Sequence, residues 1–530
     1  MVAGGAWGTG PMARSDARQR QTETRIIEID TPRVLARQEH HFAVIDIGSN
    51  SIRLVVYDDL SRAPFPRFNE KSFCALGAGI DASGRLTASA IAMAVRAVRR
   101  FDSIARAMRV ETVHVLATEA TRRASNGAEL VAAIREATGL ETRVLSGREE
   151  ATYAALGVIS GFFQPKGLAG DMGGGSLEVA EVLGDRVGDR MVSMPLGALP
   201  VKAMLADGVD AAKKGIDAVL DADLPPLLTD PVFYAIGGGW RALARVHIAL
   251  SGAPISVVNG YDVAADDVRA VAKKIARMTR DEVAALPDVP SRRIDTLPAA
   301  AAVMYRLLKQ LKPDRVVFSV FGLREGWLYA QLDPEEQYRD PLLEGAMAIG
   351  LPTARVPEFS AALARWTDDL FPGETQADRR LRLAVCALTD VGWRDHEKVR
   401  AMESFRRLLQ FPFAGISHPE RAFLAVAILA RYGGSVDETV RATIGDLLTP
   451  SLQRRAEILG RALLLGHRFS ASVPEILGQA RLRIGARSVQ LEMLSAELIP
   501  DRDAVQTRLR QLARTAGVEG AEIVQAGETT

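Results

Sequence analysis

A chain of 530 residues is too long for one hydrophobic core, so its length predicts two to four domains. Apolar residues make up 48% of the chain and charged residues 25%, which excludes a disordered or fibrous protein. The net charge of +1 and the lack of a long apolar run indicate neither a nucleic-acid nor a membrane partner, and two distant cysteines exclude a disulfide scaffold. We therefore expect a cytoplasmic protein.

The first domain is predicted from an alternation of strand-like and helix-like segments. Residues 1–40 lack hydrophobic periodicity, which is typical of a flexible leader. From Phe42 to Asp58 two apolar runs flank a short polar turn, a pattern that predicts a β-hairpin. A helix, a strand, a second helix and a further strand follow, so residues 41–153 form an α/β domain.

A second domain repeats this order, and a third region differs from both. A helix from about Arg148 to Ile159 precedes a strand, a turn of small residues and another strand at Leu177, and more strands follow at residues 232–239 and 315–322. These segments predict a second α/β domain over residues 154–333. Beyond it, apolar residues recur at helical spacing, which predicts an all-helical domain over residues 334–515 and a polar tail over residues 516–530.

Two turns share the same residues at the same spacing. An aspartate, a glycine and a serine stand at offsets 0, 2 and 5 in both, as Asp46, Gly48 and Ser51 and again as Asp171, Gly173 and Ser176. Glycines let backbone N–H groups approach phosphate oxygens, and an aspartate beside phosphate calls for a divalent cation between them. The alternative is a pair of ordinary tight hairpins, which use the same residue types for turn geometry.

Two glutamates adjoin these turns. Glu150 opens a helix directly after a strand, and Glu178 lies two residues beyond Ser176. Phosphoanhydride hydrolysis needs a group that positions or deprotonates water and a cation that takes up charge, and two carboxylates could serve both needs. Alone, a glutamate at a helix start is a favourable dipole interaction and a strand glutamate is a solvated charge.

Six segments in this order and spacing resemble the exopolyphosphatase and guanosine pentaphosphate phosphohydrolase family. They are VIDIGSNSIRLVV, ATEATRRASN, VLSGREEATYAALG, GDMGGGSLEV, AIGGG and FGLREGWLY. The resemblance covers roughly residues 42–332. It implies an α/β fold of two actin-like, ribonuclease-H-type domains with the active site in the cleft between them.

The resemblance also implies roles for individual residues. Glu150, Asp171 and Glu178 are expected to be catalytic, with Glu150 as the base that activates water. Asp46, Asp171 and Glu178 are expected to hold Mg²⁺ or Mn²⁺. The expected phosphate-binding residues are Gly48, Ser49, Asn50, Ser51, Arg122, Gly173, Gly174, Gly175 and Ser176. Arg53, Arg123 and the turn at residues 237–239 are weaker candidates, and His114 and His247 are interpreted as structural.

The helical region resembles the C-terminal domains of long exopolyphosphatases, which are related to HD-type phosphohydrolases. Thr389 precedes Asp390 where an HD site would have histidine, so a packing, dimerisation or substrate-binding module is favoured over a second metal centre. A basic track for a long anion is a further hypothesis here. It rests on seven arginines within residues 450–490, namely Arg454, Arg455, Arg461, Arg468, Arg481, Arg483 and Arg487.

The function expected from these features is hydrolysis of the terminal phosphoanhydride of inorganic polyphosphate, in a cytoplasmic homodimer without nucleic-acid or membrane partners. Removal of the 5′-terminal phosphate of guanosine pentaphosphate is the close alternative, because a shared fold does not fix the substrate. A kinase of the actin-like superfamily and a non-catalytic sensor of polyphosphate or guanosine tetraphosphate are the other two hypotheses.

Overall fold

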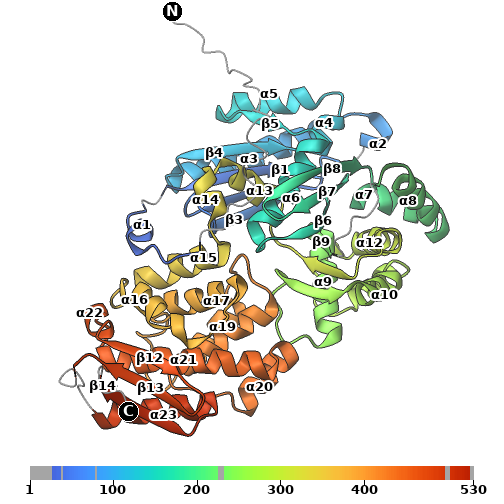
Figure 1. Cartoon of the computed structure of the whole chain (residues 1–530). Coiled ribbons are helices and arrows are strands. Elements are labelled where there is room, and N and C mark those ends of the chain that lie inside the picture. The colour runs from blue at the N-terminus through green and yellow to red at the C-terminus, as the bar shows by residue number, and fades with distance from the viewer. Residues whose placement is uncertain (1–26, 38–39, 78–79, 225–231, 496–501, 526–530) are drawn as a thin grey trace, which may run out of the picture.

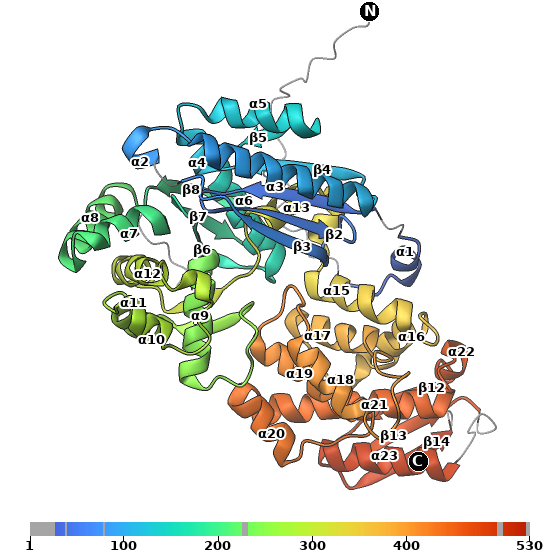
Figure 2. The same ribbon diagram turned by 180° about the vertical axis from the view of Figure 1, so that it is seen from behind.

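The computed structural model describes residues 27–37, 40–77, 80–224, 232–495 and 502–525. Two α/β domains lie together at one end of the molecule, and a largely helical domain forms the other end (Figure 1, Figure 2). The predicted fold class of two α/β domains followed by a helical region is thus confirmed. Within the described ranges, no helix is long and apolar enough to cross a bilayer.

The first domain is built on a five-stranded sheet with the order β3-β2-β1-β4-β5. The predicted hairpin pairs β1 and β2 antiparallel, β3 continues it, and β4 and β5 run parallel to β1. Helices α3 and α5 cover one face, where Ile45 and Phe101 are fully buried. The strands are β1 (Phe42–Ile47), β2 (Ser51–Tyr57), β3 (Pro66–Phe73), β4 (Thr112–Ala117) and β5 (Thr142–Val144). The helices are α2 (Ile80–Ser83), α3 (Ala88–Ala107), α4 (Glu119–Arg123) and α5 (Gly127–Thr138).

The second domain repeats this sheet and adds one edge strand. The order β8-β7-β6-β9-β11 has the same pattern of antiparallel and parallel pairs, and β10 extends the far edge. The strands are β6 (Lys166–Met172), β7 (Leu177–Leu183), β8 (Arg186–Met194), β9 (Val232–Ile236), β10 (Tyr261–Ala264) and β11 (Arg315–Phe318). Its helices are α7 (Ala198–Ala206), α8 (Val209–Asp223), α9 (Gly238–Ser251), α10 (Ala265–Ile275), α11 (Arg280–Ala284) and α12 (Leu297–Leu311).

Two helices cross between the α/β domains. Helix α6 (Gly147–Gly161) follows β5 of the first sheet, but its alanines pack on the second sheet against Ala169 and Ala180. Helix α13 (Leu323–Gln331) follows β11 of the second sheet, and its Trp327 and Leu328 pack on the first. The predicted boundary at residue 153 is therefore corrected, because it falls inside α6, which belongs by packing to the second domain.

Glycines allow these two helices to touch along their backbones. A Cβ on Gly326 of α13 would lie 1.8 Å from the carbonyl oxygen of Tyr153 in α6. A Cβ on Gly157 of α6 would lie 2.3 Å from the carbonyl oxygen of Gly322, at the start of α13. Neither position has room for a side chain, so the crossing distance is set by glycine on both helices.

The C-terminal domain is mainly helical and also contains a three-stranded sheet. Its helices are α14 (Pro334–Tyr338), α15 (Pro341–Gly350), α16 (Phe359–Trp366), α17 (Gln376–Ala387), α18 (Arg400–Gln410), α19 (His418–Arg431), α20 (Glu438–Ile444), α21 (Pro450–Ser470), α22 (Pro474–Leu477) and α23 (Arg502–Ala516). The sheet, in the order β12-β13-β14, consists of β12 (Ala480–Ile484), β13 (Ser488–Met493) and β14 (Gly520–Gln525). Two predictions are corrected here, since the region is not all-helical and β14 lies in the supposed polar tail.

Part of the predicted flexible leader is also ordered. Helix α1 (Thr31–Leu35) begins at Asp30, whose carboxylate accepts a hydrogen bond from the Arg33 backbone. Arg33 and Arg37 form ion pairs with Glu336 and Glu344, which fix α1 to helices α14 and α15. Sequence periodicity could not reveal this helix, because its partners lie about 300 residues away. The rest of the predicted leader, residues 1–26, lies outside the described residues.

The helix crossing predicts a large effect of one methyl group. Gly326→Ala should destabilise the protein by about 3 kcal/mol, the upper end of overpacking costs, because the new Cβ meets a backbone oxygen that cannot move alone. The control is Gly345→Ala in helix α15, where a Cβ has its nearest neighbour at 3.5 Å. Thermal unfolding should show a clearly lower midpoint for the first variant only; equal midpoints would contradict the crossing.

Candidate active site

The two matching turns have the same local geometry. The amide of Gly48 donates to the carbonyl of Ser51 at 3.2 Å, and the amide of Gly173 donates to the carbonyl of Ser176 at 2.9 Å. We call residues 48–51 loop 1 and residues 173–176 loop 2. Each loop follows a strand whose second-last residue is an aspartate, Asp46 in β1 and Asp171 in β6.

Across each hairpin the aspartate faces a charged residue, which is positive in the first domain and negative in the second. Asp46 pairs in register with Arg53 of β2, and Asp171 pairs with Glu178 of β7. The structural duplication therefore preserves the aspartate and the glycine loop but inverts the charge on the neighbouring strand.

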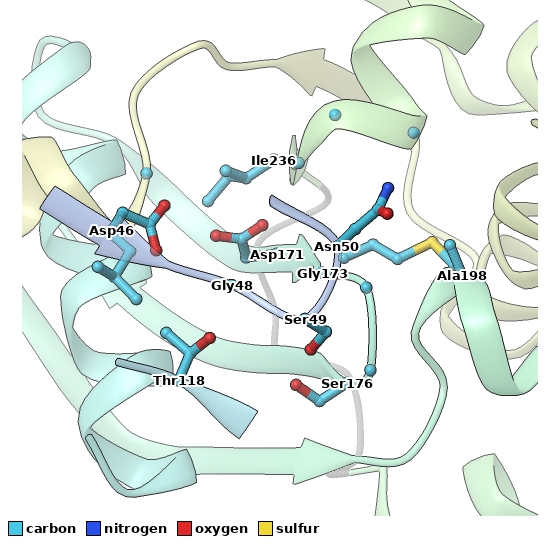
Figure 3. A pocket seen from close by; sticks show the side chains of 18 of the residues that line it. Asp46, Gly48, Ser49, Asn50, Thr118, Asp171, Gly173, Ser176, Ala198 and Ile236 are labelled. Carbon is cyan, nitrogen blue, oxygen red and sulfur yellow. The ribbon is translucent and has the colours of Figure 1, made fainter. Parts of the chain in front are cut away.

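Both loops line one cavity of about 190 Å³ between the α/β domains. Figure 3 shows Asp46 and Asp171 directed into it, with Ser49 and Ser176 on the adjoining loops. All the residues predicted for the site line this cavity except Arg122: Asp46, Gly48, Ser49, Asn50, Ser51, Glu150, Asp171, Gly173, Gly174, Gly175, Ser176 and Glu178. The turn at Gly237–Gly239 also lines it. The structure therefore brings together residues that are up to 193 positions apart in the sequence, from Asp46 to Gly239.

The two domains meet where loop 1 and loop 2 touch. A Cβ on Gly174 would lie 3.1 Å from Cβ of Ser49, so the loops are in van der Waals contact. Beside them, a Cβ on Gly77 of the first domain would lie 3.1 Å from the Leu199 side chain of helix α7.

Glu150 lies at the cavity wall and is held by Arg122. The guanidinium of Arg122 in helix α4 donates to the Glu150 carboxylate and to the carbonyl of Leu145. Burial raises the pKa of Glu150 to about 7, although its bond to Arg122 acts in the opposite direction. Arg122 does not line the cavity, and its predicted role in phosphate binding stays a prediction.

The remaining carboxylates share the cavity with Glu150. Burial, opposed by the charge of Arg241 and assisted by the nearby Asp46 carboxylate, raises the pKa of Asp171 to about 6. Burial also raises the pKa of Glu178 well above its usual range, and Glu150 adds to this. The Ser193 hydroxyl donates to Glu178 at 2.9 Å. The cavity thus concentrates negative charge that the protein does not fully neutralise, an environment that attracts a cation.

The carboxylates of the cavity fit a magnesium ion whose remaining ligands would be water and substrate phosphate. In the described part of the chain, no three side chains of the Asp, Glu, His or Cys type are grouped closely enough to hold an ion by themselves. Mg²⁺ commonly binds one or two carboxylates and completes its shell with water and substrate phosphates. Asp46, Asp171 and Glu178 supply oxygen donors of this kind.

A second cavity, of about 700 Å³, adjoins the first and is strongly basic. Among the residues that line it, seven are cationic: Arg53, Lys71, Arg241, Arg245, Arg292, Arg293 and Arg324. Only Glu70 and Glu325 are acidic, and both have partners, since Glu70 pairs with Arg100 and Glu325 accepts a hydrogen bond from Tyr57. Lys71, Arg241, Arg293 and Arg324 line both cavities, so the two spaces adjoin at these side chains.

The cations of this basic cavity repel one another. Burial and the charges of Arg293, Arg292, Arg53 and Arg241 lower the pKa of Lys71 to about 7. Burial and the neighbouring Arg324 lower the pKa of Arg241 to about 10. A bound anion would raise both pKa values, because its charge opposes the repulsion among the cations.

Most of these cations were not predicted from the sequence, and Glu119 in the first cavity was missed as well. Lys71 lies on strand β3, Arg241 on helix α9 and Arg293 in a turn before α12, so no short motif unites them. Arg53 was a weak candidate and now lines the basic cavity. The weak candidate Arg123 instead pairs with Glu119.

The histidines interpreted as structural are packed among other side chains. His114 stacks on Phe42 and contacts the edge of Trp327, and His247 forms a hydrogen bond of 2.8 Å with Tyr261. Neither lines the two cavities.

The C-terminal domain holds its acidic residue with arginines. Asp390 accepts hydrogen bonds from Arg355 at 2.7 Å and from Arg431 at 3.3 Å, and His467 lies against Thr389 at 2.8 Å. Guanidinium groups therefore neutralise Asp390.

The seven arginines of the hypothetical track lie on two elements of this domain. Four are on helix α21 and three on or beside strand β12. Arg455 pairs with Glu374, and Arg461 donates to the carbonyl of Gly434. The track stays a prediction, and the basic cavity is the concentration of positive charge that adjoins the loops.

Comparisons with known proteins show which family models and proteins this chain is similar to. The chain matches the model of the Ppx/GppA phosphatase family over residues 55–335 and the model of the exopolyphosphatase C-terminal domain over residues 342–523. It is 30% identical to Exopolyphosphatase 1 of Mycobacterium tuberculosis over 314 residues, 55% of this chain and 88% of that protein. It is 25% identical to Retrograde regulation protein 2 of Saccharomyces cerevisiae over 374 residues, 62% of this chain and 60% of that protein. A crystal structure of the Ppx/GppA family member of Aquifex aeolicus is similar with a TM-score of 0.48 and 23% identity, covering 55% of this chain and 97% of that one.

The geometry predicts that two adjacent glutamates differ in importance. Glu150→Gln should lower kcat for phosphate-chain hydrolysis by at least about 100-fold, the usual contribution of a general base. Glu149→Gln is the matched control, because Glu149 is more exposed and caps helix α6 through Ser146, a bond that an amide oxygen can keep. Circular dichroism should show both variants folded. Comparable turnover by the two variants would contradict the role assigned to Glu150.

Proposed function

Since the chain belongs to the Ppx/GppA phosphatase family, we propose that it is an exopolyphosphatase, which removes the terminal phosphate of inorganic polyphosphate as orthophosphate. The proposal rests chiefly on one observation: the first cavity, which is rich in carboxylates and is called the acidic cavity below, adjoins the larger basic cavity and shares four cationic side chains with it. A polyphosphate chain with a divalent cation at its end is complementary in charge to both cavities, since the cation faces the carboxylates and the phosphates face the cationic side chains. The predicted homodimer and cytoplasmic location stay predictions.

The proposed reaction places the chain end between the two loops. Backbone N–H groups of loop 1 and loop 2 bind the terminal phosphate, because such loops form anion-binding nests. The rest of the chain extends into the basic cavity past Lys71, Arg241 and Arg324. With the chain end bound between the two loops, removal of terminal units is favoured over internal cleavage.

In this arrangement Glu150 accepts a proton from the attacking water. Its raised pKa, about 7, suits a base that works near neutral pH, and Arg122 keeps its carboxylate directed to the cavity. Asp46, Asp171 and Glu178 would hold Mg²⁺ or Mn²⁺, which supplies positive charge for the transferred phosphoryl group. Lys71 and the arginines beside it neutralise negative charge on the leaving group, which is the shortened polyphosphate chain.

Guanosine pentaphosphate is the second candidate substrate. It ends in the same phosphoanhydride, and the basic cavity also has an apolar part, formed by Val258, Pro290 and Phe321, that could hold a guanine base. The sensor hypothesis requires that a bound phosphate chain is not cut. The kinase hypothesis requires an acceptor hydroxyl where Glu150 stands.

Parallel assays distinguish these candidates. Purified protein with Mg²⁺ should show its highest kcat/KM on long-chain polyphosphate, release orthophosphate with long residual polymer at early times, and lose activity in EDTA until Mg²⁺ is restored. Higher kcat/KM on guanosine pentaphosphate would favour the alternative substrate, and binding of polyphosphate without any turnover would favour the sensor. Early accumulation of mid-length chains would exclude end-first cleavage.

Lys71 gives the proposed substrate binding a pH dependence. Because the pKa of Lys71 is lowered to about 7, the free protein loses this charge as pH rises above 7, and the lysine must regain a proton when a polyanion binds. KM for polyphosphate should therefore rise between pH 7 and pH 9. Lys71→Arg should flatten this rise because a guanidinium stays charged, whereas the exposed Lys166→Arg should keep the wild-type slope. An unchanged slope in Lys71→Arg would rule out the assignment.

A further inference from the structure

Glu119, the first residue of helix α4, lies in the seam between loop 1 and loop 2. Its side chain lines the acidic cavity and the residue is only 8% exposed. Its Oε2 accepts a hydrogen bond from the Ser49 hydroxyl at 3.0 Å. A Cβ on Gly175 would lie 1.9 Å from the same Oε2 atom. One carboxylate of the first domain therefore contacts a phosphate loop from each domain.

Helix α4 holds this carboxylate in place. The amide and hydroxyl of Thr118, which precedes the helix, both donate to the carbonyl of Ile47 at the end of β1, at 3.1 and 3.2 Å. Arg123, one turn after Glu119, pairs with its Oε1 at 3.1 Å. The start of α4 is thus anchored to the strand that carries loop 1.

The same helix also carries Arg122, which orients Glu150. Helix α4 has only five residues, so a shift of Glu119 is transmitted directly to Arg122. The seam between the loops and the proposed base are consequently connected through one short rigid element.

The hydrogen bond to Glu119 limits how Ser49 can bind phosphate. The hydroxyl proton of Ser49 is donated to the carboxylate, so loop 1 offers phosphate its backbone N–H groups and not this proton. A carboxylate in that position also repels an incoming phosphate, a cost that the Arg123 ion pair reduces. Its chemistry therefore suits holding the loops and not binding the substrate.

We infer that Glu119 is a positioning residue for the proposed hydrolysis: it sets the distance between loop 1 and loop 2 and, through α4, the orientation of Glu150. This inference rests on the proposed function. A misplacement of about 1 Å in an active site can cost on the order of 100-fold in rate, so a lost spacer should act on kcat more than on KM.

The contact with Gly175 allows a double-mutant cycle. Glu119→Ala removes the spacer, and Gly175→Ala forces the loops apart while Glu119 remains, so each should lower kcat at least about tenfold with a KM change below about threefold. All three atoms nearest to a Cβ on Gly175 belong to Glu119. The double variant should therefore be no worse than Glu119→Ala alone, because the new methyl group fills the vacated space.

A conservative variant and a remote control separate positioning from other roles. Glu119→Gln keeps an acceptor for Ser49 and the side-chain volume, so it should recover most of the lost kcat. Glu129→Ala, in the exposed pair with Arg85, should match the wild type. Glu119→Gln as defective as Glu119→Ala would point to a chemical role for the charge, and a lower melting temperature of Glu119→Ala with unchanged kcat would point to a structural role; either result overturns the inference.

The same cycle measured on melting temperature does not depend on activity. Non-additive melting temperatures with additive kcat values would show that the contact exists but does not position the site, which overturns the inference alone. If the wild-type protein hydrolyses none of the phosphate substrates, the proposed function fails, and the inference that depends on it fails with it. Active wild-type protein with additive effects in both measurements rejects the inference and leaves the proposed function intact.

Discussion

Like charges gathered on each side of the cleft are the constraint on which the rest of the structure depends. Carboxylates in the acidic cavity raise one another's pKa. In the adjoining basic cavity, burial and the surrounding arginines lower the pKa of Lys71 to about 7. The cluster of carboxylates and the cluster of cations each lower the stability of the fold, because like charges repel more strongly away from water. Such an arrangement persists only where the surrounding fold leaves the side chains no way to separate.

The crossing of α6 and α13 supplies that rigidity. Each helix leaves one sheet and packs on the other, so neither α/β domain has a complete core without a helix from its neighbour. The glycines at the crossing bring the backbones into contact. Glu150 lies in the first turn of α6, and Arg324 lies in the first turn of α13. The helix pair that joins the two domains thus fixes one acidic and one basic side chain of the cleft, Glu150 and Arg324.

The sequence predicted those parts of the site that are local in the chain. The two loops, Asp46, Asp171, Glu150 and Glu178 stand in strand–turn–strand or strand–helix patterns whose geometry short-range rules describe, and they line one cavity as expected. The basic cavity could not be predicted, since a lysine on a strand such as β3 is typically a solvated charge until distant arginines surround it. The sheet of the C-terminal domain was missed for a similar reason. Strand β12 is short with arginines on its exposed side, and β14 pairs with β13 only after helix α23 intervenes.

The duplicated hairpins carry one further consequence through the opposite charges of Arg53 and Glu178, which occupy matching positions opposite their aspartates. Two identical halves would form a cleft with a twofold axis, and such a cleft has no front or back. A linear phosphate chain likewise reads the same from either end. When neither partner has a direction of its own, motion of one along the other is equally easy both ways. The charge inversion between the repeats removes this symmetry, because one hairpin sets an arginine opposite its aspartate and the other sets a glutamate there, so the two halves of the cleft are not equivalent.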